Sequence, residues 1–435
     1  MQFKKVLGFW DLFWLGVGGM VGVAILSFPA ITYQQAGGAS IISWVLAGVF
    51  SLFMALVYAE MVTAFPQSGA FVVFPYEAFG RGRLARYLAF LEGIGYYLGT
   101  VFGIVISAIT LGSYISPAFA SGWGLIAVAE VSVLIAGIIN IMGTKITSRA
   151  NLAMSMVFMV LFAAIIVLGL ARGNTSSLHP FLSGQGFPGL VYAIPIAILA
   201  YGSWTALVAI PEETRDIKKL PKAIFYSIVI VTVFYALIVL ATFMNQSASQ
   251  LNVPYFYTPV LAFVQGLNSG PLTYAFEFAS ILAIFAVMLV MVLANARTVV
   301  ALSKLNFLPG SLTKMSGRAI PIYATIISFA IPMVLSAFPT QYYQYVIIGA
   351  IIGTGLPRII DLAAYVRIRN RRDYRPTFRV RYGLLVALIA LMGLVISELS
   401  LGISDISWSI ATLFVLTAAF AIIEAFAKNR KASPS

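Results

Sequence analysis

The sequence predicts an all-α polytopic membrane protein with twelve transmembrane helices. Hydrophobic residues make up 61% of the 435 residues and charged residues only 9%, which is outside the usual range for soluble domains. The apolar residues gather in segments of about 20, the length that a helix needs to cross the hydrocarbon core of a bilayer. The basic residues gather in the short loops between these segments.

Each predicted helix is an apolar run that is bounded by charged, Gly-rich or Pro-containing stretches. Two of the connecting loops, 173–187 and 245–270, are long enough to be either disordered or a cap over the outer surface. We expect short helices in the second loop. The twelve expected spans are 9–35, 40–64, 86–115, 123–142, 150–171, 188–210, 222–244, 272–303, 321–338, 341–366, 382–402 and 406–427.

The loop charges predict the orientation in the membrane. When the loops are assigned alternately to the two sides, 26 of the 27 lysines and arginines fall on one side, and only Arg172 lies opposite. By the positive-inside rule, both termini are expected in the cytoplasm and the chain in the cell (plasma) membrane. The net charge of +13 is therefore a topology signal and does not point to nucleic acid.

The composition argues against catalysis. The chain has no cysteine, and its one histidine, His179, lies in a polar loop. No His, Asp and Glu cluster has metal-ligand or hydrolytic spacing, and no phosphate-binding GxxxxGKS motif occurs. We therefore expect no enzyme, no cofactor and no metal, with the lipid bilayer and a small-molecule substrate as the partners.

Two apolar spans are interrupted by small residues near their middles. The first contains Gly16, Gly18, Gly19 and Gly22, although glycine inside a helix costs roughly 1 kcal/mol relative to alanine. Gly18 and Gly22 alone have the spacing of a helix-packing motif. However, residues 200–204 interrupt the sixth span in the same way, and paired interruptions in two halves are typical of transporters with inverted repeats.

The five-span interval predicts a five-plus-five inverted repeat, since an odd number of helices places the second copy upside down. The chain is then one transmembrane transporter domain, 1–435. It comprises a first repeat at 9–171, a second at 185–367, and two further helices at 381–428. The ends of the interrupted helices supply free N–H groups for an anion and free carbonyls for a cation, the two partners that a zwitterion needs.

Four blocks of sequence resemble the amino acid, polyamine and organocation (APC) transporters. The resemblance implies the LeuT-type fold with discontinuous helices 1 and 6. It also implies secondary active or facilitative transport of amino acids or related amines by alternating access. The chain departs from the family's Gly-Ser-Gly at Gly22-Val23-Ala24, and from its Asn-Pro at Asp216-Ile217. The blocks are 18–28 with 36–38, 58–60 with 65–71 and 77–80, 212–216 with 220–224, and 297–309.

The same resemblance implies a substrate site built mainly from backbone at mid-membrane. The carboxylate is expected on N–H groups of the first interruption. The amino group is expected on carbonyls of the second, with aromatic rings beside the substrate's side chain. The implied residues are Gly22, Val23, Ala24 and Ile25, together with Ala200, Tyr201, Gly202, Ser203 and Trp204. Tyr96 and Tyr97, in the third span, are the gate candidates.

The sequence leaves the energy source open between exchange, facilitated uptake and proton symport, with sodium disfavoured. Sodium-coupled relatives use hydroxyls on helix eight, but residues 281–296 contain no Ser or Thr, so sodium coupling is disfavoured. The helix-five lysine of some proton-coupled relatives is replaced here by Phe158. An acid inside the membrane costs at least about 2.5–3.5 kcal/mol and needs a reason. Glu92 and Glu277 are therefore the candidates for proton coupling, with pairing to Arg86 as the structural alternative for Glu92.

A second function is compatible with the same residues. A membrane sensor or receptor component could keep this fold and bind an amino acid without moving it. The departure at Gly22-Val23-Ala24 leaves room for that reading, and counterflow in liposomes distinguishes the two, since a sensor binds without accumulating substrate.

Overall fold

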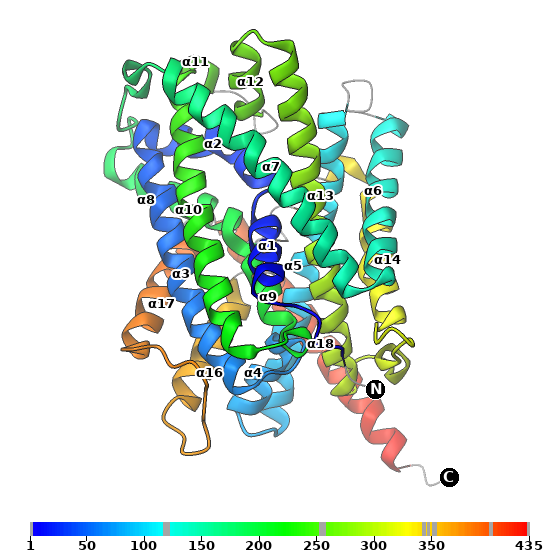
Figure 1. Ribbon diagram of the computed structural model, residues 1–435. Helices are drawn as coiled ribbons and strands as arrows, with labels where there is room; N and C mark the ends of the chain where they lie inside the picture. Colours follow the sequence, from blue (N-terminus) through cyan, green and yellow to red (C-terminus); the bar gives the residue numbers. More distant parts are fainter. Residues whose placement is uncertain are drawn as a thin grey trace.

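A computed structural model describes residues 3–115, 122–251, 258–341, 345, 349, 355–399 and 403–432. Over these residues the chain is a bundle of helices without a β-strand, and the backbones of Leu7 and Thr214 meet only as an isolated bridge (Figure 1). The fold class predicted from composition is therefore confirmed as all-helical.

Most helices begin and end within a few residues of the predicted spans. Of the predicted span 341–366, only residues 345, 349 and the part from 355 onward are described. The bounds are α3 Ser40–Ala64, α5 Arg83–Ile115, α6 Gly122–Met142, α7 Thr144–Arg172, α10 Leu220–Met244, α13 Gly270–Lys304, α14 Ile322–Ser336, α16 Leu356–Ile368, α17 Gly383–Leu399 and α18 Ile403–Ala432.

The first span is divided into two helices, α1 (Phe9–Met20) and α2 (Val23–Ala36). Between them Gly22 is extended, with φ −167° and ψ −140°. An extended residue cannot continue the i to i−4 hydrogen-bond pattern, so the helix ends and restarts here. The interruption lies where the glycine-rich stretch predicts it.

The sixth span is interrupted more mildly than the sequence predicts. It comprises α8 (Gly186–Tyr201), a 3₁₀ turn at Gly202–Trp204, and α9 (Thr205–Ala209). Gly202 keeps helical angles, φ −54° and ψ −31°. The Thr205 hydroxyl donates to the Gly202 carbonyl at 2.8 Å, which helps to hold the tightened turn. The segment is therefore overwound, and the prediction of an unwound sixth helix is wrong for this conformation.

Seven helical stretches of the described chain are long and apolar enough to cross a membrane. The first is Val23–Ala64, because α2 leads directly through the 3₁₀ turn Gly37–Ala39 into α3. Three shorter apolar helices lie at Ile322–Ser336, Gly383–Ser397 and Ile410–Ala425. These lengths fit a polytopic membrane protein.

The connecting segments form a cap at one end of the bundle. The loop 245–270 contains the expected short helices, α11 (Ala248–Leu251) and α12 (Pro259–Gly266), while Tyr255, Phe256 and Tyr257 lie outside the described residues. The loop 173–187 packs on the turn between α2 and α3, where the Ala39 N–H donates to the Phe181 carbonyl at 2.6 Å. The loop 173–187 is therefore an ordered cap.

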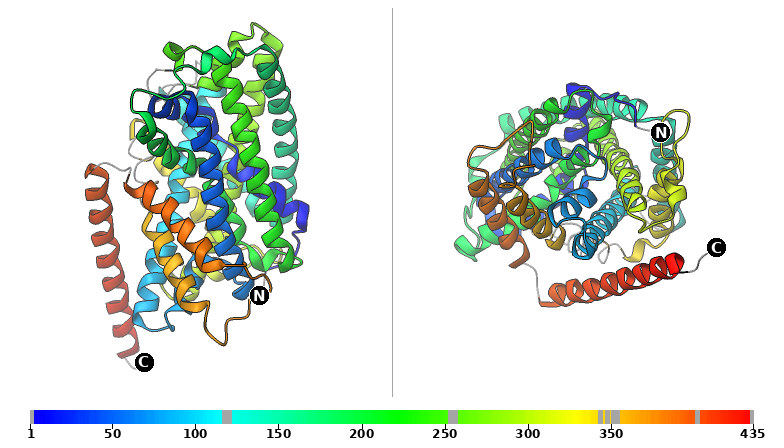
Figure 2. Two further views of the ribbon diagram at one scale, coloured as in Figure 1. Left: turned by 90° about the vertical axis from the view of Figure 1, so that its left-hand side faces the viewer. Right: turned by 90° about the horizontal axis from the view of Figure 1, so that it is seen from below.

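The helices α1 and α2 of the first interruption pack against α3, α5, α7, α8, α10 and α13 (Figure 1). The helix α18 runs along the outside and touches α5 (Figure 2). Arg86 on α5 pairs with Glu424 on α18 at 2.6 Å. The suggested pairing of Glu92 with Arg86 is therefore wrong, because a residue of the last helix takes that arginine.

Candidate functional site

A cavity of about 190 Å³ lies at the interruption between α1 and α2. One water molecule needs only roughly 10–15 Å³ by the same measure, so the cavity has room for a small organic molecule. Its wall is formed by the ends of α1 and α2 and by α3, α5, α8, the 3₁₀ turn, α13 and α16. Most of these helices come from distant parts of the sequence, as expected for a site at the centre of a bundle.

The N-terminus of α2 opens onto this cavity. Gly22, Val23 and Ala24 line it, and no side chain caps the helix at Gly22. The first turn contains no acidic residue. The first N–H groups of a helix lack partners inside the helix and carry partial positive charge. This end of α2 therefore suits a carboxylate.

The C-terminus of α1 faces the same cavity through Gly19 and Met20. Its last carbonyls carry the opposite partial charge and suit an ammonium group. The Tyr235 hydroxyl on α10 lies 2.7 Å from the Met20 carbonyl and 3.1 Å from the Ala200 carbonyl. Tyr235 therefore ties the two interrupted spans together, a role that no sequence motif indicates.

The glycines of the first interruption have different neighbours. A Cβ at Gly18 would collide with Ser155 and Asn151 on α7, and one at Gly16 would lie 2.6 Å from the Ser227 hydroxyl on α10. These two glycines permit close helix packing. A Cβ at Gly22 would instead lie 2.6 Å from Cγ2 of Val287, a residue of the cavity wall. Gly18 of the motif therefore serves helix packing, whereas Gly22 borders the cavity.

Several predicted site residues meet at the cavity and others do not. Gly22, Val23, Ala24, Ala200, Gly202, Ser203, Tyr96 and Glu92 line it. Residues outside the lining are Ile25, Tyr201, Trp204, Tyr97 and Glu277.

The residues outside the lining have other contacts. The Tyr201 hydroxyl donates to the Trp44 carbonyl at 3.0 Å, and the Trp204 ring packs edge-on against Tyr58 at 5.4 Å. The Tyr97 hydroxyl donates to the Ile327 carbonyl at 3.3 Å. The two aromatic residues of the second interruption, Tyr201 and Trp204, therefore support the bundle in this conformation and do not touch the cavity.

The carbonyls of the second interruption are also largely occupied. Ala200 accepts from Tyr235, and Ser203 accepts from the Thr205 N–H. The expected role of these carbonyls as amino-group partners would require the turn to open. The Met20 carbonyl at the end of α1 lies closer to the Tyr235 hydroxyl, at 2.7 Å, so the carbonyls of both interruptions have a partner in the conformation described.

The cavity wall carries charge from two helices. Glu92 of α5 and Arg358 of α16 both line the cavity. Asp361, one turn along α16, lies behind them and interacts with Glu92. Glu92 is 1% exposed and Asp361 0%. The sequence does not single out Asp361 and Arg358, because they lie near the end of the expected span 341–366, next to a basic loop.

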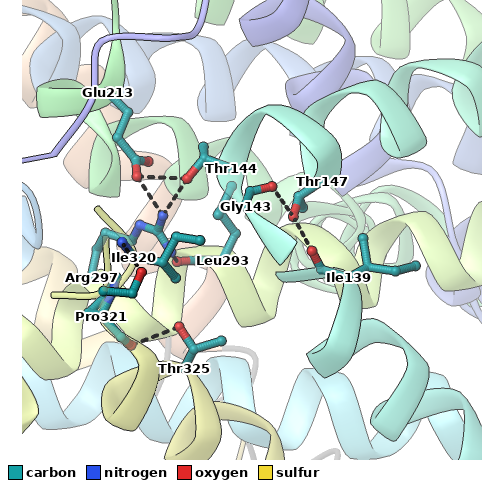
Figure 3. A network of polar contacts seen from close by, with 11 residues as sticks. Ile139, Gly143, Thr144, Thr147, Glu213, Leu293, Arg297, Ile320, Pro321 and Thr325 are labelled. Atoms are coloured by element: carbon teal, nitrogen blue, oxygen red, sulfur yellow. Dashed lines mark hydrogen bonds and ion pairs between the residues drawn. The ribbon is translucent and has the colours of Figure 1, made fainter. Parts of the chain in front are cut away.

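A buried ion pair joins α13, α7 and the segment that follows α9 (Figure 3). Arg297 of α13 donates to Glu213 at 2.5 Å and to Thr144 of α7 at 2.8 Å. Both charged side chains are 1% exposed. The N-terminal segment joins this cluster, since the N–H groups of Val6 and Leu7 donate to the Glu213 carbonyl at 2.9 and 3.0 Å. We call Arg297, Glu213 and Thr144 the end cluster.

The sequence was also compared with known proteins. The model of a family described as amino acid permease matches residues 7–431. Cationic amino acid transporter 5 of Arabidopsis thaliana is 26% identical over 354 residues, which are 78% of this chain and 60% of that protein. The chain thus spans about three fifths of the length of this relative.

Two bacterial relatives are covered more fully. The branched-chain amino acid permease BcaP of Bacillus subtilis (strain 168) is 27% identical over 335 residues, 72% of this chain and 70% of that protein. The uncharacterized transporter Mb2022c of Mycobacterium bovis (strain ATCC BAA-935 / AF2122/97) is 24% identical over 424 residues, 97% of this chain and 92% of that protein. Their similarity to this chain extends over most of its helices.

Proposed function

The chain belongs to the amino acid permease family, and on that premise we propose that it transports amino acids or related small amines across the membrane by alternating access. The observation that supports this most is the cavity at the α1–α2 interruption, with a helix N-terminus and a helix C-terminus both at its wall. The relatives named as amino acid transporters and permeases support the same substrate class.

The proposed recognition is by main chain. The N–H groups of Gly22, Val23 and Ala24 hold the substrate's carboxylate, each bond to a charged group contributing about 1.5–3 kcal/mol. The carbonyls at the end of α1 hold its amino group. Main-chain contacts are the same for every α-amino acid, so the side chain of the substrate is selected by the apolar part of the wall, which includes Val287 and Met291.

The proposed architecture has twelve spans, made of two inverted repeats of five helices and two further helices. The first described residues and the end of α18 lie at the same end of the bundle, which fits an even number of spans (Figure 2). The excess of basic loops supports a cytoplasmic position for both ends and residence in the cell membrane.

The proposed coupling is to protons, with sodium disfavoured. The part of α13 near the cavity presents Val287 and Met291 and has no hydroxyl between 281 and 296. Of the two acids considered from sequence, Glu92 lines the cavity, whereas Glu277 is partly exposed and outside it. Glu92 is therefore the better candidate.

Counterflow in liposomes tests the proposed function. Purified protein is reconstituted into vesicles loaded with one unlabelled amino acid, and radiolabelled amino acid is added outside. A transporter accumulates label transiently without any ion gradient. Binding in a thermal-shift screen without counterflow for any amino acid would contradict transport and would favour the sensor alternative.

A further inference from the structure

We propose that Glu92 and Asp361 share one proton at the cavity wall, and that this carboxyl pair is the proton-coupling site of the transporter. The inference deepens the proposed function and rests on it. It adds Asp361, on α16, as the partner of Glu92, on α5.

The geometry of the pair comes first. Both side chains are buried, with 1% exposure for Glu92 and 0% for Asp361. Their carboxyl groups lie within interaction distance of each other. Among the described residues, both oxygens of Asp361 and Oε2 of Glu92 are buried without a hydrogen-bond partner. Two ionised carboxylates are both acceptors and cannot bond each other, whereas one proton between them supplies the missing donor.

The charges around the pair favour a single proton. Two adjacent buried carboxylates repel each other and are both costly to desolvate, so one of them holds a proton in preference to both ionising. Arg358, on the same helix as Asp361, acts on Glu92 and lowers the cost of one negative charge. The single positive charge of Arg358 does not offset two negative charges on the pair. The pair therefore titrates as a unit.

The remaining neighbours do not replace this proton. Tyr58 of α3 interacts with both carboxyl groups and with Arg358, and Tyr96 of α5 interacts with Arg358. Phe71 from α4 (Ala70–Ala78) and both Val287 and Met291 from α13 add apolar groups to the cavity wall. Ser203 and Thr205, which also line it, carry no charge. The hydroxyl of Tyr58 can donate one hydrogen bond but cannot neutralise a second negative charge.

The position of Glu92 links the proton to the substrate. Glu92 lines the same cavity as the interruption of α1 and α2. A substrate ammonium group in the cavity stabilises the ionised pair, and an empty cavity stabilises the protonated pair. Substrate binding and protonation of the carboxyl pair are thus coupled, because each supplies the positive charge that the pair needs.

Uptake under an imposed proton gradient tests the inference. In proteoliposomes, the wild-type initial rate is expected to rise several-fold when protons are driven outward, because substrate binding releases the shared proton and the two therefore exchange across the membrane. The ratio of rates with and without the gradient is expected to fall to about one in Glu92→Gln and Asp361→Asn, because each variant removes the shared proton. Asp373→Asn, the same change at an exposed acid paired with Arg371, is the control and keeps the wild-type ratio.

Equal stimulation of Asp361→Asn and wild type would overturn the inference, as would a wild-type rate that ignores the gradient. Absence of counterflow in the wild type would instead count against the proposed function. The two failures are therefore distinguishable.

A thermal measurement keeps the test independent of transport. The folded pair binds a proton that the unfolded chain releases at neutral pH, so the folded state loses stability as the pH rises. The Tm of the wild type is expected to fall more steeply with rising pH than that of either amide variant. Superimposable curves for all three proteins would overturn the shared proton.

Discussion

Gly22 and Gly18, four residues apart, carry out different tasks. Gly18 lets α1 approach the polar side chains of α7, whereas Gly22 leaves the backbone at the start of α2 open to the cavity. The packing motif and the proposed substrate site therefore lie in the same stretch of sequence, on two faces of it. The distinction is testable at single residues.

Gly22→Ala places a methyl group 2.6 Å from Cγ2 of Val287, which forces the wall of the cavity to move. Such overpacking costs about 1–3 kcal/mol, so we expect substrate binding to weaken about tenfold. The second substitution Val287→Ala makes room and should restore most of the affinity. Isothermal titration calorimetry measures both proteins. A loss of folding without loss of affinity would assign Gly22 to packing alone.

At the scale of elements, Tyr235 of α10 fastens the two interrupted spans. Its single hydroxyl can reach the carbonyls at the end of α1 and at Ala200, so it stabilises the conformation in which both helix ends face the cavity. An α10 that moves with the interrupted helices would carry this bond with it. An α10 that stays fixed would have to break it.

Tyr235→Phe is expected to lower stability by about 1–3 kcal/mol, because buried carbonyls lose their donor. Tyr33→Phe is the matched control. Tyr33 is also buried, but its hydroxyl has no partner among the described residues, so its removal should be neutral or stabilising. Thermal unfolding in detergent measures both variants. Equal losses in the two would show that the Tyr235 hydroxyl does not fasten the helices.

At the scale of the whole molecule, the end cluster joins segments that lie far apart in the sequence, and we propose that it closes one side of the bundle. Arg297, Glu213 and Thr144 connect α13, the segment after α9, and α7, and the N-terminal segment is hydrogen-bonded to the same point. Alternating access requires such a closure to open in another conformation. The cost of a buried, unpaired charge then sets the balance between conformations.

Glu213→Gln should favour opening at this end, since removing one partner of a buried pair costs about 3–5 kcal/mol. The chain has no cysteine, so Ser203→Cys in the cavity gives a single labelling site. Maleimide added on the side of the end cluster should label Ser203→Cys faster when Glu213→Gln is present. Asp373→Asn, at an exposed pair with Arg371, should change the rate little. Unchanged labelling in both would remove the end cluster as a closure.

Much of this architecture follows from linear patterns. Apolar length predicts where most of the helices lie, and the excess of glycine predicts the interruption before Val23. The sequence does not predict Asp361 or Tyr235, because their roles arise from contacts across 269 and 215 positions, respectively, and no periodicity joins such residues. It also predicts an unwound second interruption, where the Thr205 hydroxyl and N–H hold a tight turn instead.

The central claim is that the backbone N–H groups at the start of α2 hold the substrate's carboxylate. Val23 is the first residue of α2, the one helical position that accepts proline without damage. Val23→Pro removes an N–H and keeps the helix, while Val23→Ala keeps the N–H and trims the side chain. The measurement is amino acid affinity by titration calorimetry.

Loss of one charge-assisted bond, about 1.5–3 kcal/mol, predicts binding that is roughly ten- to a hundredfold weaker in Val23→Pro than in Val23→Ala. Equal affinities in these two variants would contradict main-chain recognition at the α1–α2 interruption.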